Sequence, residues 1–487
     1  MRHIPNHMNL RTTTATGRYD VAPRENCRLS GRLHRVSSKQ PFLNFLLVAL
    51  IFTCAMRNWQ YFIGVRIMIY DIFLLLISIT FLASRITGRQ VHELPTALKI
   101  SVKWLWIIFF LGIMTFPVVW YISLPSPWGM YLKGTVSSLL YTAGLTIIIF
   151  YVNSQPEQLI NKLLKIYILG ATVSALFCIL EIALALQGID LGKIVFGTIS
   201  TYRDPYALEK PFYYEWSLFF RAAGVAGVNA QGTYLASVIP LLLFTKPFRS
   251  TWKNQLTATI CLLALALTMS RTALFSLVAG ITIYAWFGLK HSIKPIWYLL
   301  LAALPLIVLF MTFKLETLSL LETRGLGQSF EITAANRTKI AVTTFNSLLS
   351  YPFGYGLNQY AAVVKQSDII DFSEVDKLFP NRKLWQNRLD YENIHNSFLT
   401  ILSEGGWLLL IANIAFYISI IRIYYRSRSE YRIGALCSIG ALLTGGLTNN
   451  TLELFSSKLL IILLALLTIT RKTSNQSGGP LSEGSSK

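Results

Sequence analysis

The sequence predicts an all-α polytopic membrane protein of about twelve transmembrane helices, with a large, partly helical periplasmic loop between helices nine and ten. Of its 487 residues, 53% are apolar and only 14% are charged, whereas soluble domains carry about 25% charged residues. The apolar residues form blocks of about 15 to 22, the length that crosses a bilayer. Segments predicted to be cytoplasmic hold 26 Lys and Arg against 6 Asp and Glu, the asymmetry that the positive-inside rule expects.

The apolar blocks define the expected helices and, through them, the domains. An even number of spans places both ends of the chain in the cytoplasm. The polar tails 1–40 and 471–487 have too little apolar surface to fold and are expected to be disordered. Between them lie helices one to nine (41–313), the outer loop (314–397) and helices ten to twelve (398–470). We expect the individual helices over 41–56, 65–83, 103–122, 134–152, 164–186, 222–245, 255–269, 272–288, 295–313, 398–421, 432–449 and 456–470.

Charge and cysteine content exclude two other classes of protein. The net charge of +21 is dispersed between apolar blocks, so it indicates membrane topology and membrane lipid as a partner, not nucleic acid. Of the five cysteines, Cys54, Cys178, Cys261 and Cys437 fall within expected helices and Cys27 lies in the basic tail. This placement predicts neither a disulfide framework nor a thiolate metal site.

The two long loops, 187–221 and 314–397, both fall on the outer face, and long loops in compact proteins are usually functional. In the second loop, residues 335–348 carry apolar side chains at helical spacing. The sequence YPFGYG at 351–356 then breaks the pattern with Pro and Gly. We expect a helix that ends in a tight turn.

Arg271 is the first candidate functional residue, in the run TMSRTALF. Only 36 residues separate Lys253 from Lys290, so each crossing has about 18 residues, or roughly 27 Å of helix. Arg271 therefore lies at the tip of a helical hairpin near the outer surface, where it should face an anion or a water-filled cavity. The alternative is an arginine that extends to lipid headgroups.

Two other arginines lie on the outer face. Arg221 ends the first outer loop and is followed by Gly224, Gly227 and Asn229, which permit close approach of a ligand or of another helix. Arg337 lies on the expected loop helix, where a solvated surface residue is an equally good interpretation.

His395 is the only one of six histidines predicted on the outer face. It directly precedes helix ten, where Asn396 or Ser397 can cap the helix. A histidine at a helix start is often a capping residue, but this position beside Glu392 makes it the best general-base candidate on that side.

Other groups give weaker signals. The acidic cluster Asp368, Asp371, Glu374 and Asp376 is better explained as a solvated face than as a metal site. Intramembrane Arg66, Asp71 and Glu181 need partners on other helices. The sequence contains no glycine-rich nucleotide loop and no HExxH motif.

These motifs, taken in order, resemble the O-antigen ligase and polymerase family of bacterial membrane glycosyltransferases. The resemblance rests on Arg221 with its glycines and Asn229, SRT at 270–272, Arg337 followed by Pro352, Gly354 and Gly356, and HNSFLTILSEGG from His395. It covers roughly residues 40–470 and implies an inner-membrane enzyme whose catalytic loop faces the periplasm. The implied donor is a glycan on undecaprenyl diphosphate, and the implied acceptor is a hydroxyl of another glycan or of lipid A core.

The resemblance implies further roles. Arg221 and Arg271 would bind the donor diphosphate and His395 would activate the acceptor hydroxyl, while Arg337, Asn229 and Asn396 would bind substrate, with no metal or cofactor. We slightly favour a polymerase, for which a flippase and a chain-length regulator would be further partners, over a ligase. A polar-lipid transporter or flippase using Arg66, Asp71 and Glu181 is the alternative from another class, although the chain has no evident inverted repeat.

Overall fold

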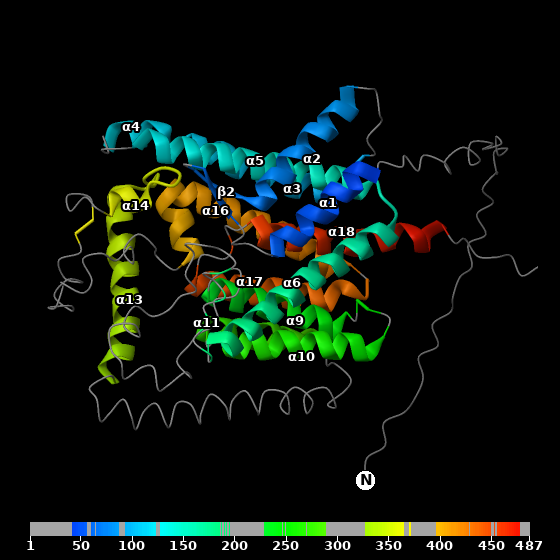
Figure 1. The fold of residues 1–487 in the computed structure, drawn as a ribbon. Coiled ribbons are helices and arrows are strands. Elements are labelled where there is room, and N and C mark those ends of the chain that lie inside the picture. Colours follow the sequence, from blue (N-terminus) through cyan, green and yellow to red (C-terminus); the bar gives the residue numbers. More distant parts are fainter. Residues whose placement is uncertain are drawn as a thin grey trace, which may run out of the picture. The chain divides into compact units, whose positions relative to one another are not determined.

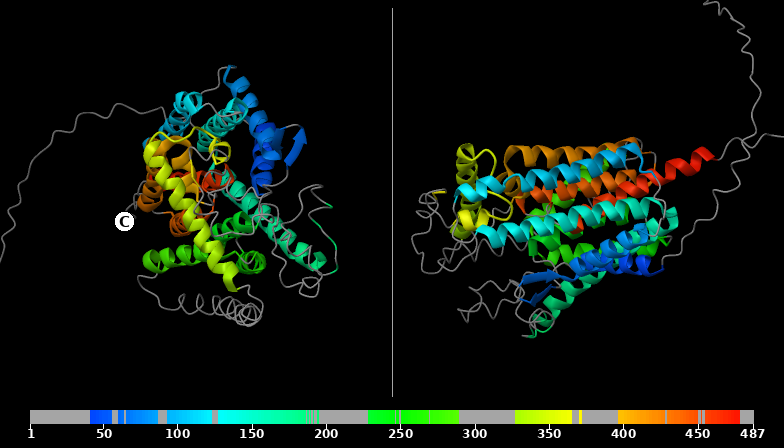
Figure 2. Two further views of the ribbon diagram at one scale, coloured as in Figure 1. Left: turned by 90° about the vertical axis from the view of Figure 1, so that its left-hand side faces the viewer. Right: turned by 90° about the horizontal axis from the view of Figure 1, so that it is seen from above.

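The computed structural model describes residues 41–55, 60–63, 65–86, 93–122, 127–185, 187, 189, 191, 194, 228–245, 247–248, 250–268, 270–288, 327–364, 370–371, 396–427, 429–449, 452 and 455–477. Apart from Pro41, which belongs to the unit Met1–Pro41, these residues lie in one compact unit, Phe42–Lys487. Inside that unit most of the long helices run side by side, and helix α13 runs across them (Figures 1 and 2).

Helices make up most of the described chain. Eleven of the twelve expected helices overlap an observed helix, and the expected helix at 295–313 lies outside the described residues. The observed helices are α1 (Pro41–Ala55), α2 (Ile69–Ile86), α3 (Thr96–Ile113), α4 (Phe116–Ile122), α5 (Pro127–Asn153), α6 (Glu157–Ala185), α9 (Val228–Phe244), α10 (Thr251–Leu267), α11 (Arg271–Gly288), α13 (Gly327–Ser350), α14 (Tyr360–Val363), α16 (Ser397–Arg426), α17 (Tyr431–Thr448) and α18 (Phe455–Ser477).

One part of the all-α prediction was wrong. Strands β1 (Gln60–Ile63) and β2 (Val65–Met68) pair antiparallel, with Phe62 opposite Arg66. The helix expected over 65–83 therefore begins only at Ile69, and Arg66 is a strand residue rather than a helical one. The reason is local: QYFIGVRIM combines aromatic and β-branched residues around a glycine, a hairpin signal that hydropathy alone does not register.

The described helices have the length and composition of membrane spans. Within the described residues, four segments are long and apolar enough to cross a bilayer: Thr96–Tyr121, Tyr131–Asn153, Glu157–Leu184 and Ser397–Arg426. Five shorter apolar helices accompany them. The chain is thus a multi-pass helical membrane protein, and the total of twelve spans stays a prediction.

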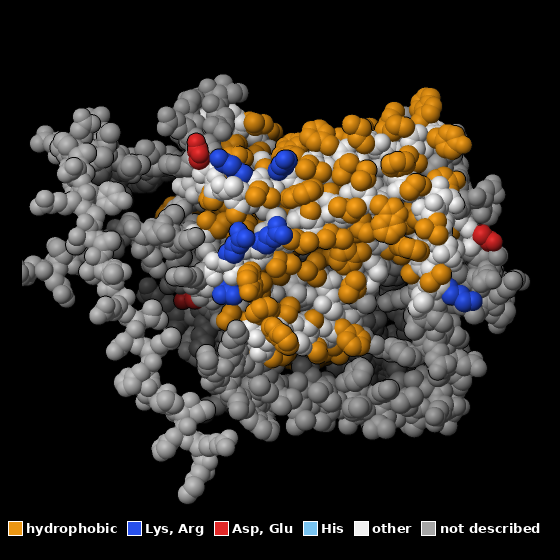
Figure 3. Space-filling model, turned by 180° about the vertical axis from the view of Figure 1, so that it is seen from behind, with side chains coloured by type: hydrophobic (Ala, Val, Ile, Leu, Met, Phe, Trp, Pro, Cys, Tyr) orange, Lys and Arg blue, Asp and Glu red, His pale blue; other side chains and the backbone are white. Residues whose placement is uncertain are grey.

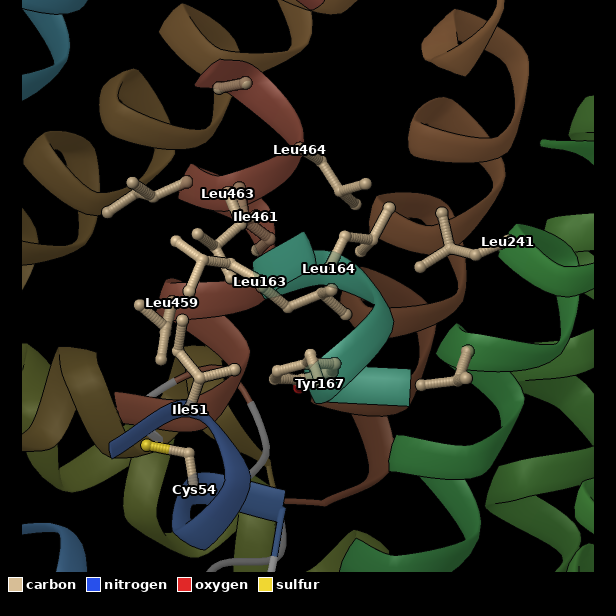
Figure 4. Close-up of a cluster of buried hydrophobic side chains, with 14 of the residues drawn as sticks. Ile51, Cys54, Leu163, Leu164, Tyr167, Leu241, Leu459, Ile461, Leu463 and Leu464 are labelled. Atoms are coloured by element: carbon tan, nitrogen blue, oxygen red, sulfur yellow. The ribbon is translucent and has the colours of Figure 1, made fainter. Parts of the chain in front are cut away.

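The core is built around α18. Every residue from Leu459 to Leu467 is buried, as expected for a helix that is apolar on all sides and enclosed by others. Figure 4 shows Leu459 and Leu463 beside Leu163 and Tyr167 of α6 and Ile51 of α1. The phenol of Tyr167 donates a hydrogen bond to the Ser456 carbonyl oxygen over 3.3 Å, which links α6 to the start of α18.

The outer surfaces of the helices are apolar as well. Large side chains point outward from most of them, among them Leu75 of α2, Leu139 of α5, Phe275 of α11 and Ile411 of α16. In Figure 3, hydrophobic side chains cover most of the coloured surface, with charged side chains toward its two sides. A surface of this kind matches the hydrocarbon layer of a bilayer.

Candidate functional site

The packing of α9, α11 and α17 fixes which helix ends lie together. Helices α9 and α11 are parallel, since Gly232 packs on Ala273 and the rings of Phe244 and Tyr284 stack with centroids 3.7 Å apart. Helix α17 runs antiparallel to both. Its Gly445 contacts Thr233 and Ser276, whereas its earlier residue Cys437 meets Gly280, further along α11. Small residues at these crossings allow the close approach that is typical of membrane helices. We call the end at which α9 and α11 begin the Asn229 end.

A hydrogen bond joins the starts of α9 and α11. The hydroxyl of Ser270 donates to Oδ1 of Asn229 over 2.9 Å, and the Ala273 amide donates to Ser270 Oγ over 3.4 Å. Ser270 therefore both connects the two helices and caps α11. Arg271 is the first residue of α11, directly after the turn that joins α10 to α11. The backbone of Arg271 thus lies where two helices meet in sequence, its predicted place near the outer surface stays a prediction, and its side chain lies outside the described residues.

The start of α16 is fixed on the turn between α17 and α18. Asn396, one of the two candidate caps, caps α16, with its Oδ1 accepting from the Leu399 amide over 3.0 Å. The next residue, Ser397, is buried; its hydroxyl donates to the Asn449 carbonyl oxygen over 2.8 Å and accepts from the Leu452 amide. His395 lies outside the described residues, one position before this rigid cap.

These contacts place the starts of α11 and α16 at the same end of α17. Arg271 precedes Ser276 by five residues in α11, and Asn449 follows Gly445 by four residues in the antiparallel α17. At 1.5 Å per residue, the two separations along the helix axes are about 7.5 and 6 Å. Because α11 and α17 are antiparallel, both lead toward the same end. The backbone of Arg271 and the Asn449 carbonyl that binds Ser397 therefore lie at a similar level. The structure thus brings Asn229, the backbone of Arg271, and Asn396 to one end.

The other two predicted arginines are placed only in part. Arg337 is in α13 by its backbone, and its side chain is not described; Arg221 lies outside the described residues. The helix expected over 335–348 is confirmed, since it lies within α13. Of the acidic cluster considered as a metal site, Asp371 is described and is exposed.

The loop after α13 inserts into a break in α16. Gly406 has φ 66° and ψ −166°, which interrupts the helix and is a conformation open essentially to glycine alone. The loop residues Tyr355 and Gly356 donate backbone hydrogen bonds to the carbonyl oxygens of Ser403 and Glu404, over 2.7 and 2.9 Å. In return, the Trp407 amide donates to the Pro352 carbonyl oxygen over 3.2 Å. We call this arrangement the loop–helix latch.

Buried tyrosines support the loop–helix latch from the α13 side. The phenols of Tyr355 and Tyr360 are hydrogen-bonded to Ser347 and Thr344, respectively. Burial raises the pKa of Tyr355 to about 12, so this phenol stays protonated at physiological pH. The turn predicted at 351–356 is confirmed, with Gly354 and Gly356 at φ 75° and 106°.

Glu404 and Lys458 are ionisable residues of apolar helices that the sequence analysis did not single out. The Glu404 carboxylate accepts a hydrogen bond from the Asn358 amide over 3.1 Å, and the charge of Lys458, in the first turn of α18, acts on it. The signal was present, because Glu404 is the only acidic residue in α16 and an ionisable group in an apolar helix is a functional candidate by default.

The family comparison covers this same part of the chain. Residues 256–414 match the family model described as O-antigen ligase. This match covers about a third of the chain and supports a relationship to the O-antigen ligase family. The match begins in α10 and ends in α16, so it includes Arg271, Arg337, His395 and the whole loop–helix latch. The matched segment is shorter than residues 40–470, the range over which the motifs resemble the family. Arg221 and Asn229 precede the matched segment.

The match to the O-antigen ligase model supports a glycosyltransferase activity of the ligase or polymerase type. A comparison with curated proteins found no match to the chain.

Proposed function

We propose that this protein transfers a glycan from undecaprenyl diphosphate to a sugar hydroxyl at the periplasmic face of the bacterial inner membrane, with both termini cytoplasmic. The observation that carries the proposal is the convergence of the starts of α9, α11 and α16, tied by the Ser270–Asn229 and Ser397–Asn449 hydrogen bonds. Arg271 begins one of these helices, and His395 directly precedes the cap of another.

In the proposed reaction, the acceptor hydroxyl oxygen attacks the anomeric carbon of the donor glycan. The bond between that carbon and the diphosphate oxygen breaks, and the diphosphate leaves with the electron pair. The hydroxyl proton passes to His395, which acts as general base. Attack from the face opposite the leaving group inverts the configuration at the anomeric carbon. No step requires a metal ion.

The arginines would stabilise the charge that develops on the leaving diphosphate. Guanidinium groups bind phosphate oxygens in pairs, and such contacts are strongest where water is excluded. The starts of α9, α11 and α16 add the partial positive charge of helix N-termini at the same end. We assign Arg221 and Arg271 to the diphosphate and Arg337 to substrate binding.

Asn229 and Asn396 now have structural roles that do not need a substrate. Asn229 links α9 to the α11 cap, and Asn396 caps α16. Their proposed contribution to substrate binding is therefore indirect, through the positions of Arg271 and His395.

The decisive experiment compares two histidine variants in a transfer assay. We expect His395→Ala to abolish glycan transfer at unchanged membrane abundance, because the acceptor loses its base. The matched control is His291→Ala, in a loop predicted to face the cytoplasm, which should transfer at the wild-type rate. Product formation by His395→Ala near the wild-type level would remove the proposed base.

The acceptor is tested with purified protein in vesicles that contain lipid-linked repeat units, with and without lipid A core. We slightly favour polymerisation, for which chains should lengthen on the lipid carrier without lipid A core. Product that forms only when lipid A core is present would identify a ligase instead. Carrier-linked glycan that merely crosses the vesicle membrane would indicate a transporter.

A further inference from the structure

Helix α13 has three distinct faces, which can be followed from Thr338 to Ser350, where its side chains are described. At about 3.6 residues per turn, residues four apart in sequence share a face. One face is buried, a second is apolar and exposed, and a third is polar. The buried face holds Ile340, Thr344 and Leu348; the exposed apolar face holds Val342, Phe345 and Leu349; the polar face holds Lys339, Thr343, Asn346 and Ser350.

The buried face accounts for the attachment of α13 to the rest of the molecule. Ile340 and Leu348 share a cluster with Tyr355 of the latch loop and with Leu399 and Leu402 of α16. This contact leaves the second face uncovered by the described residues. Leu349 is 65% exposed, Val342 is 52% exposed, and Phe353 just beyond the helix is 62% exposed. A soluble surface rarely presents so continuous an apolar stripe without a partner.

The exposed apolar face continues the lipid-facing side of α16. The ring of Phe345 meets that of Trp407 edge to face, with centroids 6.0 Å apart. Trp407 directly follows the break at Gly406 and starts the stretch Trp407–Arg426, whose side chains Leu408, Ile411, Ile414 and Ile418 point outward. Its twenty residues measure about 30 Å, the thickness of the hydrocarbon layer. A tryptophan at this position is typical of the membrane interface.

The direction of α13 fits the same boundary. Figures 1 and 2 show α13 running across the direction of α16 and its neighbours, at the end where α16 begins. A helix that crosses the spans at the level of Trp407 lies along the membrane surface. Its three faces then have three different surroundings: protein, lipid and water.

We infer that α13 is an interfacial helix whose Val342, Phe345 and Leu349 insert into the acyl-chain layer of the bilayer leaflet at the Asn229 end. The polar face, with Lys339 and Asn346, lies toward the water and the lipid headgroups, the arrangement of amphipathic helices that lie in the membrane plane. Because α13 also carries the loop–helix latch, bound lipid would hold the latch at the membrane surface.

Site-directed fluorescence tests this directly on the full-length protein. An environment-sensitive label is attached to single cysteines at Val342 and Leu349 on the apolar face, and at Asn346 and Ser350 on the polar face as matched controls. All four positions are exposed or point outward, so the label displaces no core residue. Cys27 is changed to serine, and the other four cysteines are buried. The protein is placed in phosphatidylethanolamine–phosphatidylglycerol vesicles with nitroxide on the acyl chains.

We expect nitroxide lipid to quench the labels at Val342 and Leu349 several-fold more than those at Asn346 and Ser350, and aqueous iodide to show the reverse order. Equal quenching at all four positions would overturn the inference. Shielding of Val342 and Leu349 from both quenchers would also overturn it, because a protein surface or a second copy would then cover this face. The measurement involves no glycan, so its outcome is independent of the proposed transfer reaction.

Discussion

The substitution Gly406→Ala tests the loop–helix latch most directly. An alanine Cβ at this position would overlap the carbonyl oxygen of Pro352, and the backbone conformation itself costs a non-glycine residue about 1–3 kcal/mol. The variant can relieve both penalties if the loop undocks from α16. Undocking breaks the three backbone hydrogen bonds made by Tyr355, Gly356 and Trp407.

The expected size of the effect follows from the backbone penalty that opening relieves. In the wild type, opening costs the three hydrogen bonds, at about 1 kcal/mol each. A penalty of about 1–3 kcal/mol on the docked loop raises the population of the open loop about 5- to 150-fold, at 1.4 kcal/mol per factor of ten. Hydrogen–deuterium exchange of the purified protein measures this population locally. We expect the amides of Tyr355, Gly356 and Trp407 to exchange about 5- to 150-fold faster than in the wild type.

Gly129→Ala is the matched control, because a Cβ on this glycine of α5 would meet nothing within 4 Å. Its exchange rates at the three latch amides should equal those of the wild type. If Gly406→Ala leaves the same amides fully protected, the latch does not depend on the conformation of Gly406, and the reasoning is refuted.

Three more predictions concern the Asn229 end. Asn229→Ala and Ser270→Ala should show a coupling of about 0.5–1.5 kcal/mol in a double-mutant cycle of thermal unfolding, because they share one hydrogen bond; strict additivity would contradict the bond. Arg271→Lys should be severely impaired in glycan transfer at unchanged abundance, since an ammonium group cannot contact a phosphate in the bidentate way of a guanidinium; wild-type turnover would indicate that Arg271 only reaches lipid headgroups. Transfer by the purified protein should persist in excess chelator, and a strict requirement for a divalent ion would direct attention to the acidic residues near Asp371.

Local patterns predicted much of the helical framework. Long apolar blocks located the membrane helices, and the apolar spacing at 335–348 found the central part of α13. Asn396 and Ser397 were the two candidate caps from their residue types at the start of a helix, and the structure has Asn396 as the cap. The same reading failed at β2, because hydropathy does not distinguish a β-branched strand from the first turn of a helix.

The candidate site also contains residues that the sequence pointed to and contacts that only the structure revealed. Arg221, Arg271, Arg337 and His395 were selected from their residue types and the predicted topology alone, and their roles stay proposals. Glu404 and Lys458 were missed because their relation depends on a contact between α16 and α18, which are separated by a third helix in sequence. Gly405 and Gly406 were visible as a pair, but nothing local shows that a loop some fifty residues earlier inserts at the break.

The sequence by itself determined that this protein lies in a lipid bilayer and approximately where its helices begin and end. Burial of apolar side chains in a bilayer depends on the length and composition of each segment, which can be read residue by residue. Only the tertiary structure decided which helix ends meet. The Ser270–Asn229 and Ser397–Asn449 hydrogen bonds and the loop–helix latch join residues 41 to 55 positions apart. Contacts at such separations depend on the packing of whole helices, and no local spacing records them.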